Sequence, residues 1–213
     1  MRLVLSLALV VILGVAAFWF QTDGFSVVTT EAARRADIIK QPRQIPDAVL
    51  QASNNHNVGL LDDLASDGRV AVINFMYTRC PSICTTMGAE FQRLQDQILE
   101  QGWGDQIRLI SISFDPADTA RWLGRYQEQM GVNPGVWQAM LASDQVQRNA
   151  LLQAFGIIVV PAPMGQFEHN GAYHIVTPDG LLRRIVDLED SVMLLSHLQS
   201  YARRDKQVKV VQP

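Results

Sequence analysis

The sequence predicts an α/β fold: a mainly parallel central sheet with flanking helices and a C-terminal antiparallel hairpin, preceded by an N-terminal transmembrane helix. Three observations support this prediction. Apolar runs suited to buried strands alternate with segments of helical periodicity. Two further apolar segments flank the turn sequence Pro178-Asp179-Gly180. An uncharged apolar stretch occupies residues 3–20.

The N-terminal stretch reads LVLSLALVVILGVAAFWF. As a helix it would be about 27 Å long, close to the roughly 30 Å hydrocarbon core of a bilayer. A cleaved signal peptide is the main alternative, with Val15-Ala16-Ala17 as the cleavage site. The aromatic cluster Phe18-Trp19-Phe20 would then begin the mature protein, whereas such clusters are typical of a membrane interface. The pattern therefore favours an uncleaved anchor, with a buried core helix as a third alternative.

The charges beside this stretch predict its orientation. Arg2 precedes it and, by the positive-inside rule, stays in the cytoplasm while the rest is exported. Arg34 and Arg35 follow the stretch closely and weaken the asymmetry. We expect a membrane-anchored protein with its domain on the extracytoplasmic side, periplasmic or equivalent, where thiols tend to oxidise.

Length and charge limit the classes of protein that remain. The 213 residues suffice for one ordinary domain plus an anchor. A net charge of −3 without long runs of one sign argues against a nucleic-acid partner. We divide the chain into an anchor or signal segment (1–22), a linker and lead-in (23–57), a folded domain (58–204) and a tail (205–213).

The folded domain shows a regular order of elements. The expected strands are 70–77 and 107–114, followed by a hairpin over 172–177 and 181–188. The expected helices are 81–101, 118–130, a segment from the capping pair Asp144 and Gln147 to Gly156, and 190–203. This order is the thioredoxin arrangement, in which chemistry gathers at the carboxyl ends of the strands.

Two cysteines, Cys80 and Cys84, stand where the strand 70–77 leads into the following helix, Cys80 just before it and Cys84 in its first turn. A helix N-terminus favours the thiolate, which both attacks disulfides and binds soft metals. A structural disulfide is the alternative, but a bridge across so small a loop adds little stability. Three residues separate the cysteines, whereas thiol oxidoreductases of this fold usually have two.

Four histidines are available as imidazole ligands. Two thiolates and one imidazole would give copper a three-coordinate site. His169 lies in QFEHNGAY, interpreted as a loop entering the hairpin, and is the favoured ligand. His174 within the strand and His56 in a polar loop stay open as alternatives, whereas His197 falls in the last helix.

Taken in order, the segments NFMYTRCPSIC, SISFDP, FGI and EHNGAYHIVTPDG resemble the Sco/SenC family over about residues 58–190. The resemblance implies that Cys80, Cys84 and His169 bind the metal. It also matches Asp115 to an acidic residue near the site, for which a strand-end cap is the alternative interpretation. Met87 is a candidate thioether ligand, although its helical spacing favours the core.

The sequence departs from the family pattern near both ends of the site. Thr85 stands where the family often has proline after the second cysteine. The imidazole lies in Glu168-His169-Asn170, where the family usually has Asp-His-Thr or Asp-His-Ser. The hydrogen-bond partner that orients His169 therefore has to be found in the structure.

The resemblance implies a copper metallochaperone, carrying Cu(I) or Cu(II), for cytochrome c oxidase. It would deliver copper to the copper-A subunit or reduce the cysteines of that site, and a thiol reductant protein would be a second partner. Cys80 and Cys84 would then be a redox pair as well as ligands.

Two other classes remain. One is an extracytoplasmic thiol-disulfide oxidoreductase or thiol peroxidase, in which Arg79 beside Cys80 would activate the thiol. The other is a membrane-bound copper sensor. An imidazole facing the sulfurs would favour metal, whereas a cis-proline such as Pro161 would favour thiol exchange.

Overall fold

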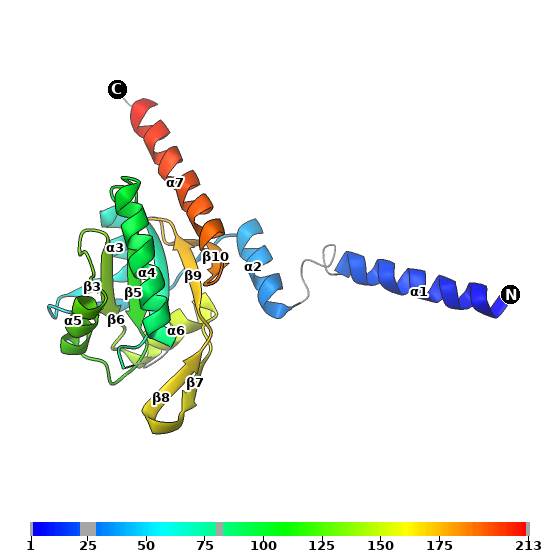
Figure 1. The fold of residues 1–213 in the computed structure, drawn as a ribbon, viewed down its shortest axis with the longest axis horizontal. Helices are drawn as coiled ribbons and strands as arrows, with labels where there is room; N and C mark the ends of the chain where they lie inside the picture. The colour runs from blue at the N-terminus through cyan, green and yellow to red at the C-terminus, as the bar shows by residue number, and fades with distance from the viewer. Residues whose placement is uncertain (1, 22–28, 80–82, 212–213) are drawn as a thin grey trace. The chain divides into compact units, whose positions relative to one another are not determined.

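The computed structural model describes residues 2–21, 29–79 and 83–211 (Figure 1). Contacts divide the chain into two units, Met1–Pro42 and Arg43–Pro213. The second unit holds all the strands and the candidate site.

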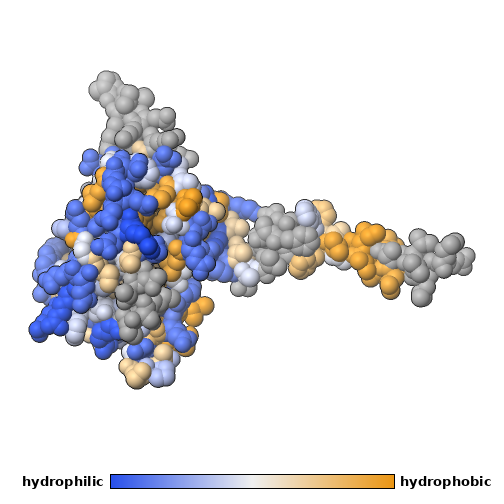
Figure 2. Space-filling model, in the orientation of Figure 1, coloured by the Kyte–Doolittle hydropathy of each residue, from blue (hydrophilic) through white to orange (hydrophobic). Residues whose placement is uncertain are grey.

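The first unit contains two helices, α1 (Arg2–Gln21) and α2 (Thr30–Lys40). The Thr29 side chain caps α2 by accepting a hydrogen bond from the Ala32 amide. Exposed apolar side chains, among them Val10, Ile12 and Phe20, lie along the described part of α1 (Figure 2). Within the described ranges, however, no helix combines the length and the apolar character that crossing a bilayer requires, so the predicted transmembrane helix over residues 3–20 is not supported.

An eight-stranded sheet forms the second unit. Its order is β1 (Arg43–Gln44), β10 (Leu181–Asp187), β9 (Ala172–Val176), β4 (Val70–Met76), β5 (Ile107–Ser113), β6 (Trp137–Leu141), β2 (Val49–Ala52) and β3 (Asn57–Gly59). Among the strands of the described residues, only the β4–β5 and β5–β6 pairs are parallel.

The expectation of a mainly parallel sheet is therefore wrong: the sheet is mixed. Two hairpins, β9–β10 and β2–β3, pair antiparallel with the two sides of the parallel centre, and β1 pairs antiparallel with the outer side of β10. The first hairpin was predicted from its turn. The second was not predicted, because its strands are too short to show a clear period. It begins in the residues expected to be linker and lead-in.

Five helices accompany the sheet: α3 (Leu60–Asp67), α4 (Ile83–Glu100), α5 (Ala120–Gln129), α6 (Gln145–Phe155) and α7 (Ser191–Val211). The ends of α6 confirm the predicted signals, since Asp144 accepts from the Gln147 amide and Gly156 closes the helix at φ 68°. Helix α7 continues to Val211, into the residues expected to form a tail.

A separate two-stranded hairpin was not predicted. It pairs β7 (Val159–Ala162) with β8 (Gln166–His169) through a short 3₁₀ turn, η1 (Pro163–Gly165), and extends away from the main sheet (Figure 1). Proline normally argues against a strand, which hid β7 in the sequence. A two-stranded ribbon has an unpaired side on each strand and therefore accommodates Pro161.

Strands β4 and β5 are buried along almost their full length and form the centre of the core. Helix α4 packs its apolar stripe on this centre, with Phe91 stacked on Tyr173 at 5.7 Å between ring centroids. Met87 belongs to the same stripe and is 1% exposed, so the core interpretation of this residue is confirmed.

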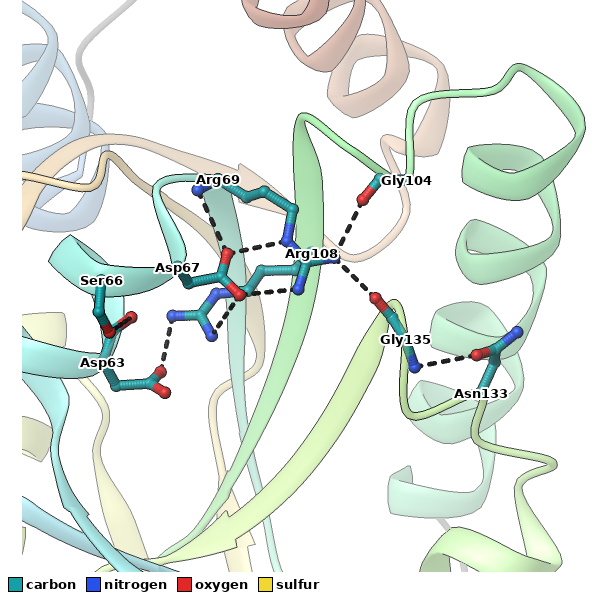
Figure 3. Close-up of polar contacts among 8 residues, drawn as sticks. All are labelled: Asp63, Ser66, Asp67, Arg69, Gly104, Arg108, Asn133 and Gly135. Atoms are coloured by element: carbon teal, nitrogen blue, oxygen red, sulfur yellow. Dashed lines mark hydrogen bonds and ion pairs between the residues drawn. The ribbon is translucent and has the colours of Figure 1, made fainter.

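An ionic network holds the amino ends of the parallel strands (Figure 3). Buried Arg108 donates to Asp63 at 2.7 Å. Arg69 binds both carboxylate oxygens of Asp67 and the carbonyl oxygens of Gly104 and Gly135. The candidate site lies at the opposite, carboxyl ends of the same strands.

Candidate metal centre

The predicted sulfur ligands are the part of the site for which the structure supplies no geometry. Cys80 lies outside the described residues. Cys84 is in the first turn of α4, as predicted, but its side chain lies outside them as well. The site is therefore built from the segments that lead to the cysteines and from the hairpin that carries His169.

Asp118 fixes the segment that follows β4. Its carboxylate accepts from the Thr78 amide at 2.8 Å, from the Thr78 hydroxyl at 2.5 Å and from the Ser113 hydroxyl at 2.6 Å. Asp118 is 6% exposed, so these bonds form where solvent competes weakly. The chain is thereby held two residues before Cys80.

Asp115 follows β5 and uses its two carboxylate oxygens for two different contacts. One carboxylate oxygen accepts from the Ala117 amide at 2.8 Å, which is the strand-end cap. The other binds the Arg79 guanidinium at 2.7 Å. The Asp115 side chain is 1% exposed and that of Arg79 43%, so the pair reaches from the interior to the surface. The hydrogen bond to Asp115 raises the pKa of Arg79.

His169 is the last residue of β8, which corrects its predicted place in a loop. Its ring packs edge-on against Phe114, with 4.9 Å between centroids, and against Tyr77 at 6.3 Å. Burial lowers the pKa of His169 below the usual 6.5, opposed by a hydrogen bond to the Asn170 carbonyl. The imidazole is therefore biased toward the neutral form, which is the form that binds metals.

The orientation of His169 comes from Asn170, the residue at which the sequence departs from the family pattern. The His169 Nδ1 lies 3.0 Å from the Asn170 carbonyl oxygen. A proton on Nδ1 makes this bond and leaves the lone pair on Nε2. The Asn170 side chain in turn accepts from the Ile158 amide at 2.7 Å and donates to the Gly156 carbonyl at 2.9 Å.

Tyr77 joins the hairpin to the end of β4. Its hydroxyl donates to the Phe167 carbonyl at 3.1 Å and accepts from the Phe167 amide at 3.2 Å. A cavity of about 420 Å³ opens beside this junction, and His169 contributes to its wall. His169 is thus brought to the strand end that leads to Cys80.

The other histidines belong to other elements. His174 is fully buried in β9, with Nδ1 3.1 Å from the Ile73 carbonyl oxygen and Nε2 3.2 Å from that of Phe155. His56 is exposed in the turn between β2 and β3, and His197 lies in α7. Pro161, the residue considered as a cis-proline, has a trans peptide bond in β7.

No cluster of three or more His, Cys, Asp and Glu side chains suited to a metal is found within residues 2–21, 29–79 and 83–211, of which the two cysteine side chains are not part. Three residues of this region were missed from the sequence: Tyr77, Asp118 and Asn170. Of these three, Asp118 had a sequence signal, because it is a second acidic residue close to Asp115 after the strand 107–114. The other two act through contacts across the fold.

Comparison with known proteins identifies relatives. The family model described as SCO1/SenC matches residues 53–203. A Stutzerimonas stutzeri protein whose name describes it as copper-binding is 34% identical over 121 residues, which cover 54% of this chain and 57% of that protein. The chain thus spans little more than half the length of this curated relative.

Solved structures share the fold. A SCO1/SenC family lipoprotein from Bacillus anthracis superposes with a TM-score of 0.65 at 19% identity, covering 77% of this chain and 99% of that one. BsSco, described as a Sco family cytochrome c oxidase assembly protein with a disulfide switch, gives 0.64 at 24%, covering 76% and 95%. Copper-bound ScoI from Bradyrhizobium japonicum gives 0.61 at 21%, covering 75% and 99%.

The family match covers most of the chain, and its span includes Cys80, Cys84, Asp115 and His169. The mixed sheet with its helices agrees with the thioredoxin-like fold of the solved relatives. This chain therefore belongs to the SCO1/SenC family.

Proposed function

We propose that this protein is a copper metallochaperone that holds copper with Cys80, Cys84 and His169. The observation that carries the proposal is the placement of His169. The β7–β8 hairpin brings a neutral-biased imidazole, with Nδ1 bound to a carbonyl, beside Tyr77, three residues before Cys80. Two thiolates and one imidazole are a donor set that suits copper.

The names of the relatives point the same way. One curated relative is described as copper-binding, and a structural relative was solved with copper bound. In this chain Asn170 would orient the imidazole, and Asp118 and Asp115 would hold the approach to Cys80.

Copper release would follow from oxidation of the cysteines. When the Cys80 and Cys84 thiols form a disulfide, two electrons pass to an acceptor disulfide, which takes up two protons and becomes a dithiol. Both sulfur ligands are lost, and His169 alone holds copper weakly. One cysteine pair can thus carry either metal or electrons.

Metal analysis of the purified full chain tests this proposal. We expect one copper per chain when the cysteines are reduced and none after the disulfide is confirmed by mass spectrometry. Cys80→Ser and Cys84→Ser should each lose most of the binding. Copper that stays bound to the disulfide form would contradict the proposal. Rapid peroxide consumption or disulfide reduction without copper binding would favour the oxidoreductase class instead.

The proposed client is the copper-A subunit of cytochrome c oxidase, since the related BsSco is described as an oxidase assembly protein. Two reactions with the soluble copper-A domain separate delivery from reduction. Copper-loaded chain mixed with the reduced domain tests metal transfer, and metal-free reduced chain mixed with the disulfide form tests thiol exchange. The absence of both reactions would exclude this client.

We further propose that residues 3–20 attach the protein to a membrane with Arg43–Pro213 on the extracytoplasmic side. The uncharged apolar segment supports this, as does the lipoprotein among the structural relatives. Fractionation of native membranes and N-terminal sequencing test it. A mature protein beginning near Phe18 would refute the anchor while leaving export intact.

A further inference from the structure

Tyr77 stands out among the buried polar residues because it joins the two segments that carry the proposed ligands. It directly follows β4 and is 2% exposed. Its hydroxyl makes both available backbone hydrogen bonds of one residue, Phe167, as donor to the carbonyl and acceptor from the amide. Ninety residues of sequence separate Tyr77 from Phe167.

The bonded residue matters because of its register. Phe167 pairs with Pro161 within the hairpin, and Val159 pairs with His169. In an antiparallel pair the amide and carbonyl of alternate residues point away from the partner strand. Tyr77 supplies the acceptor and the donor for these two groups of Phe167, which lies two residues before His169 on the same strand.

The aromatic rings complete the junction. Tyr77 contacts Phe167 edge-on at 5.3 Å and Phe114 at 5.5 Å between centroids. Phe114 contacts both Phe167 at 5.7 Å and His169 at 4.9 Å. The imidazole thus rests on rings that belong to the ends of β4 and β5.

The hairpin is exposed at its turn and along β7. Its turn carries Met164, which is 91% exposed, and β7 exposes Val160 at 52%. Asn170 fixes the base of the ribbon through Gly156 and Ile158, on the α6 side. Tyr77 and Phe114 link the ribbon to the ends of β4 and β5.

We propose that Tyr77 is a positioning residue for the metal ligand His169: its hydroxyl holds the β7–β8 hairpin in the place from which the imidazole reaches copper. This inference rests on the proposed function for its copper readout, but the tether itself is a property of the metal-free fold. Tyr77→Phe keeps the ring and its aromatic contacts and removes only the two hydrogen bonds.

The test is a double-mutant cycle on Cu(I) affinity, measured by chelator competition on the purified full chain. Tyr77→Phe should weaken binding on the order of tenfold, as expected when a group that orients a metal ligand is lost. In the His169→Ala background the same change should have no further effect, because Tyr77 acts through the imidazole. Tyr126→Phe, a buried tyrosine on α5, is the matched control and should leave affinity unchanged.

Two outcomes on copper would overturn the inference. One is unchanged affinity in Tyr77→Phe. The other is an equal loss in both backgrounds, which would mean that Tyr77 acts on the cysteines. Nitrogen hyperfine coupling in the Cu(II) spectrum gives an independent readout, since it should weaken in Tyr77→Phe and stay normal in Tyr126→Phe.

A metal-free arm separates this inference from the proposed function. Hydrogen exchange of the Phe167 amide should accelerate at least tenfold in Tyr77→Phe, because its acceptor is removed. If the wild-type chain bound no copper, the proposed function would fail and this arm would still test the tether. Unchanged protection of the Phe167 amide would overturn it.

Discussion

Asp118 accepts two hydrogen bonds from Thr78, one from the amide at 2.8 Å and one from the hydroxyl at 2.5 Å. Ser113, the last residue of β5, donates a third at 2.6 Å. One buried carboxylate therefore ties the end of β5 to the segment leading to Cys80.

Replacing Asp118 with Asn should lower the free energy of unfolding by about 1–3 kcal/mol, because an amide cannot accept all three hydrogen bonds in a buried place. Chemical denaturation measures this cost. Asp144→Asn is the matched control: Asp144 caps α6 at an exposed position, and asparagine caps a helix equally well, so its cost should be near zero. Equal losses of stability in the two variants would show that the three hydrogen bonds of Asp118 do not hold β5 to the segment before Cys80.

His169 and His174 should respond in opposite ways to truncation. His174→Ala should cost about 2–5 kcal/mol of stability, since it leaves a cavity and removes the ring's hydrogen bond to a buried carbonyl, but should keep copper binding. His169→Ala should weaken copper binding while the fold survives. Copper affinity and thermal midpoints of both variants measure the difference. Copper lost in His174→Ala and kept in His169→Ala would show that the ligand assignment is misplaced.

The lowered pKa of His169 predicts a specific pH dependence of the metal-free, reduced protein. In the unfolded chain this imidazole takes up its proton near the usual 6.5, whereas in the fold it does so at lower pH because of burial. Below 6.5 the unfolded state binds more protons, so this contribution to stability falls as pH decreases toward the folded pKa.

His169→Gln should flatten the slope of the thermal midpoint in that window, below pH 6.5. An NMR titration of the His169 ring measures its pKa directly. A His169 midpoint at or above the usual 6.5 would contradict the prediction.

The pair of Arg79 and Asp115 should tune the reactivity of the neighbouring Cys80 in opposite directions. Arg79→Ala removes a positive charge beside the thiol in sequence, so alkylation at neutral pH should slow several-fold. Asp115→Asn keeps an acceptor for the Ala117 amide but removes the compensating negative charge, so alkylation should accelerate. Rates of iodoacetamide labelling, followed by mass spectrometry, check both signs. Changes in the same direction would show that the pair acts through structure rather than charge.

Local patterns were sufficient for the central elements. The continuous apolar runs that became β4 and β5 need two covered faces, and the spacing of Met87, Phe91, Leu94 and Ile98 fits one side of a helix. The cap residues Asp144 and Gly156 bound α6 as predicted, because helix ends are satisfied by adjacent residues. The hairpin around Pro178-Asp179-Gly180 was fixed equally locally.

Pairing between distant segments could not be predicted in the same way. The mixed sheet depends on β9 lying beside β4 and β2 beside β6, and neither contact has a short-range signal. Short strands such as β2 and β3 bury too few side chains to show a period. The β7–β8 hairpin was hidden because its prolines read as breaks in any strand.

The sequence by itself determined the cysteine motif, the candidate ligand His169 and the family, since these rest on residue type, spacing and order along the chain. Only the tertiary structure decided how His169 is oriented and held. Its ring is set by the Asn170 carbonyl and rests on Phe114, and its hairpin is bound by Tyr77. These are directional contacts between segments that meet only after the chain folds, so no local pattern encodes them.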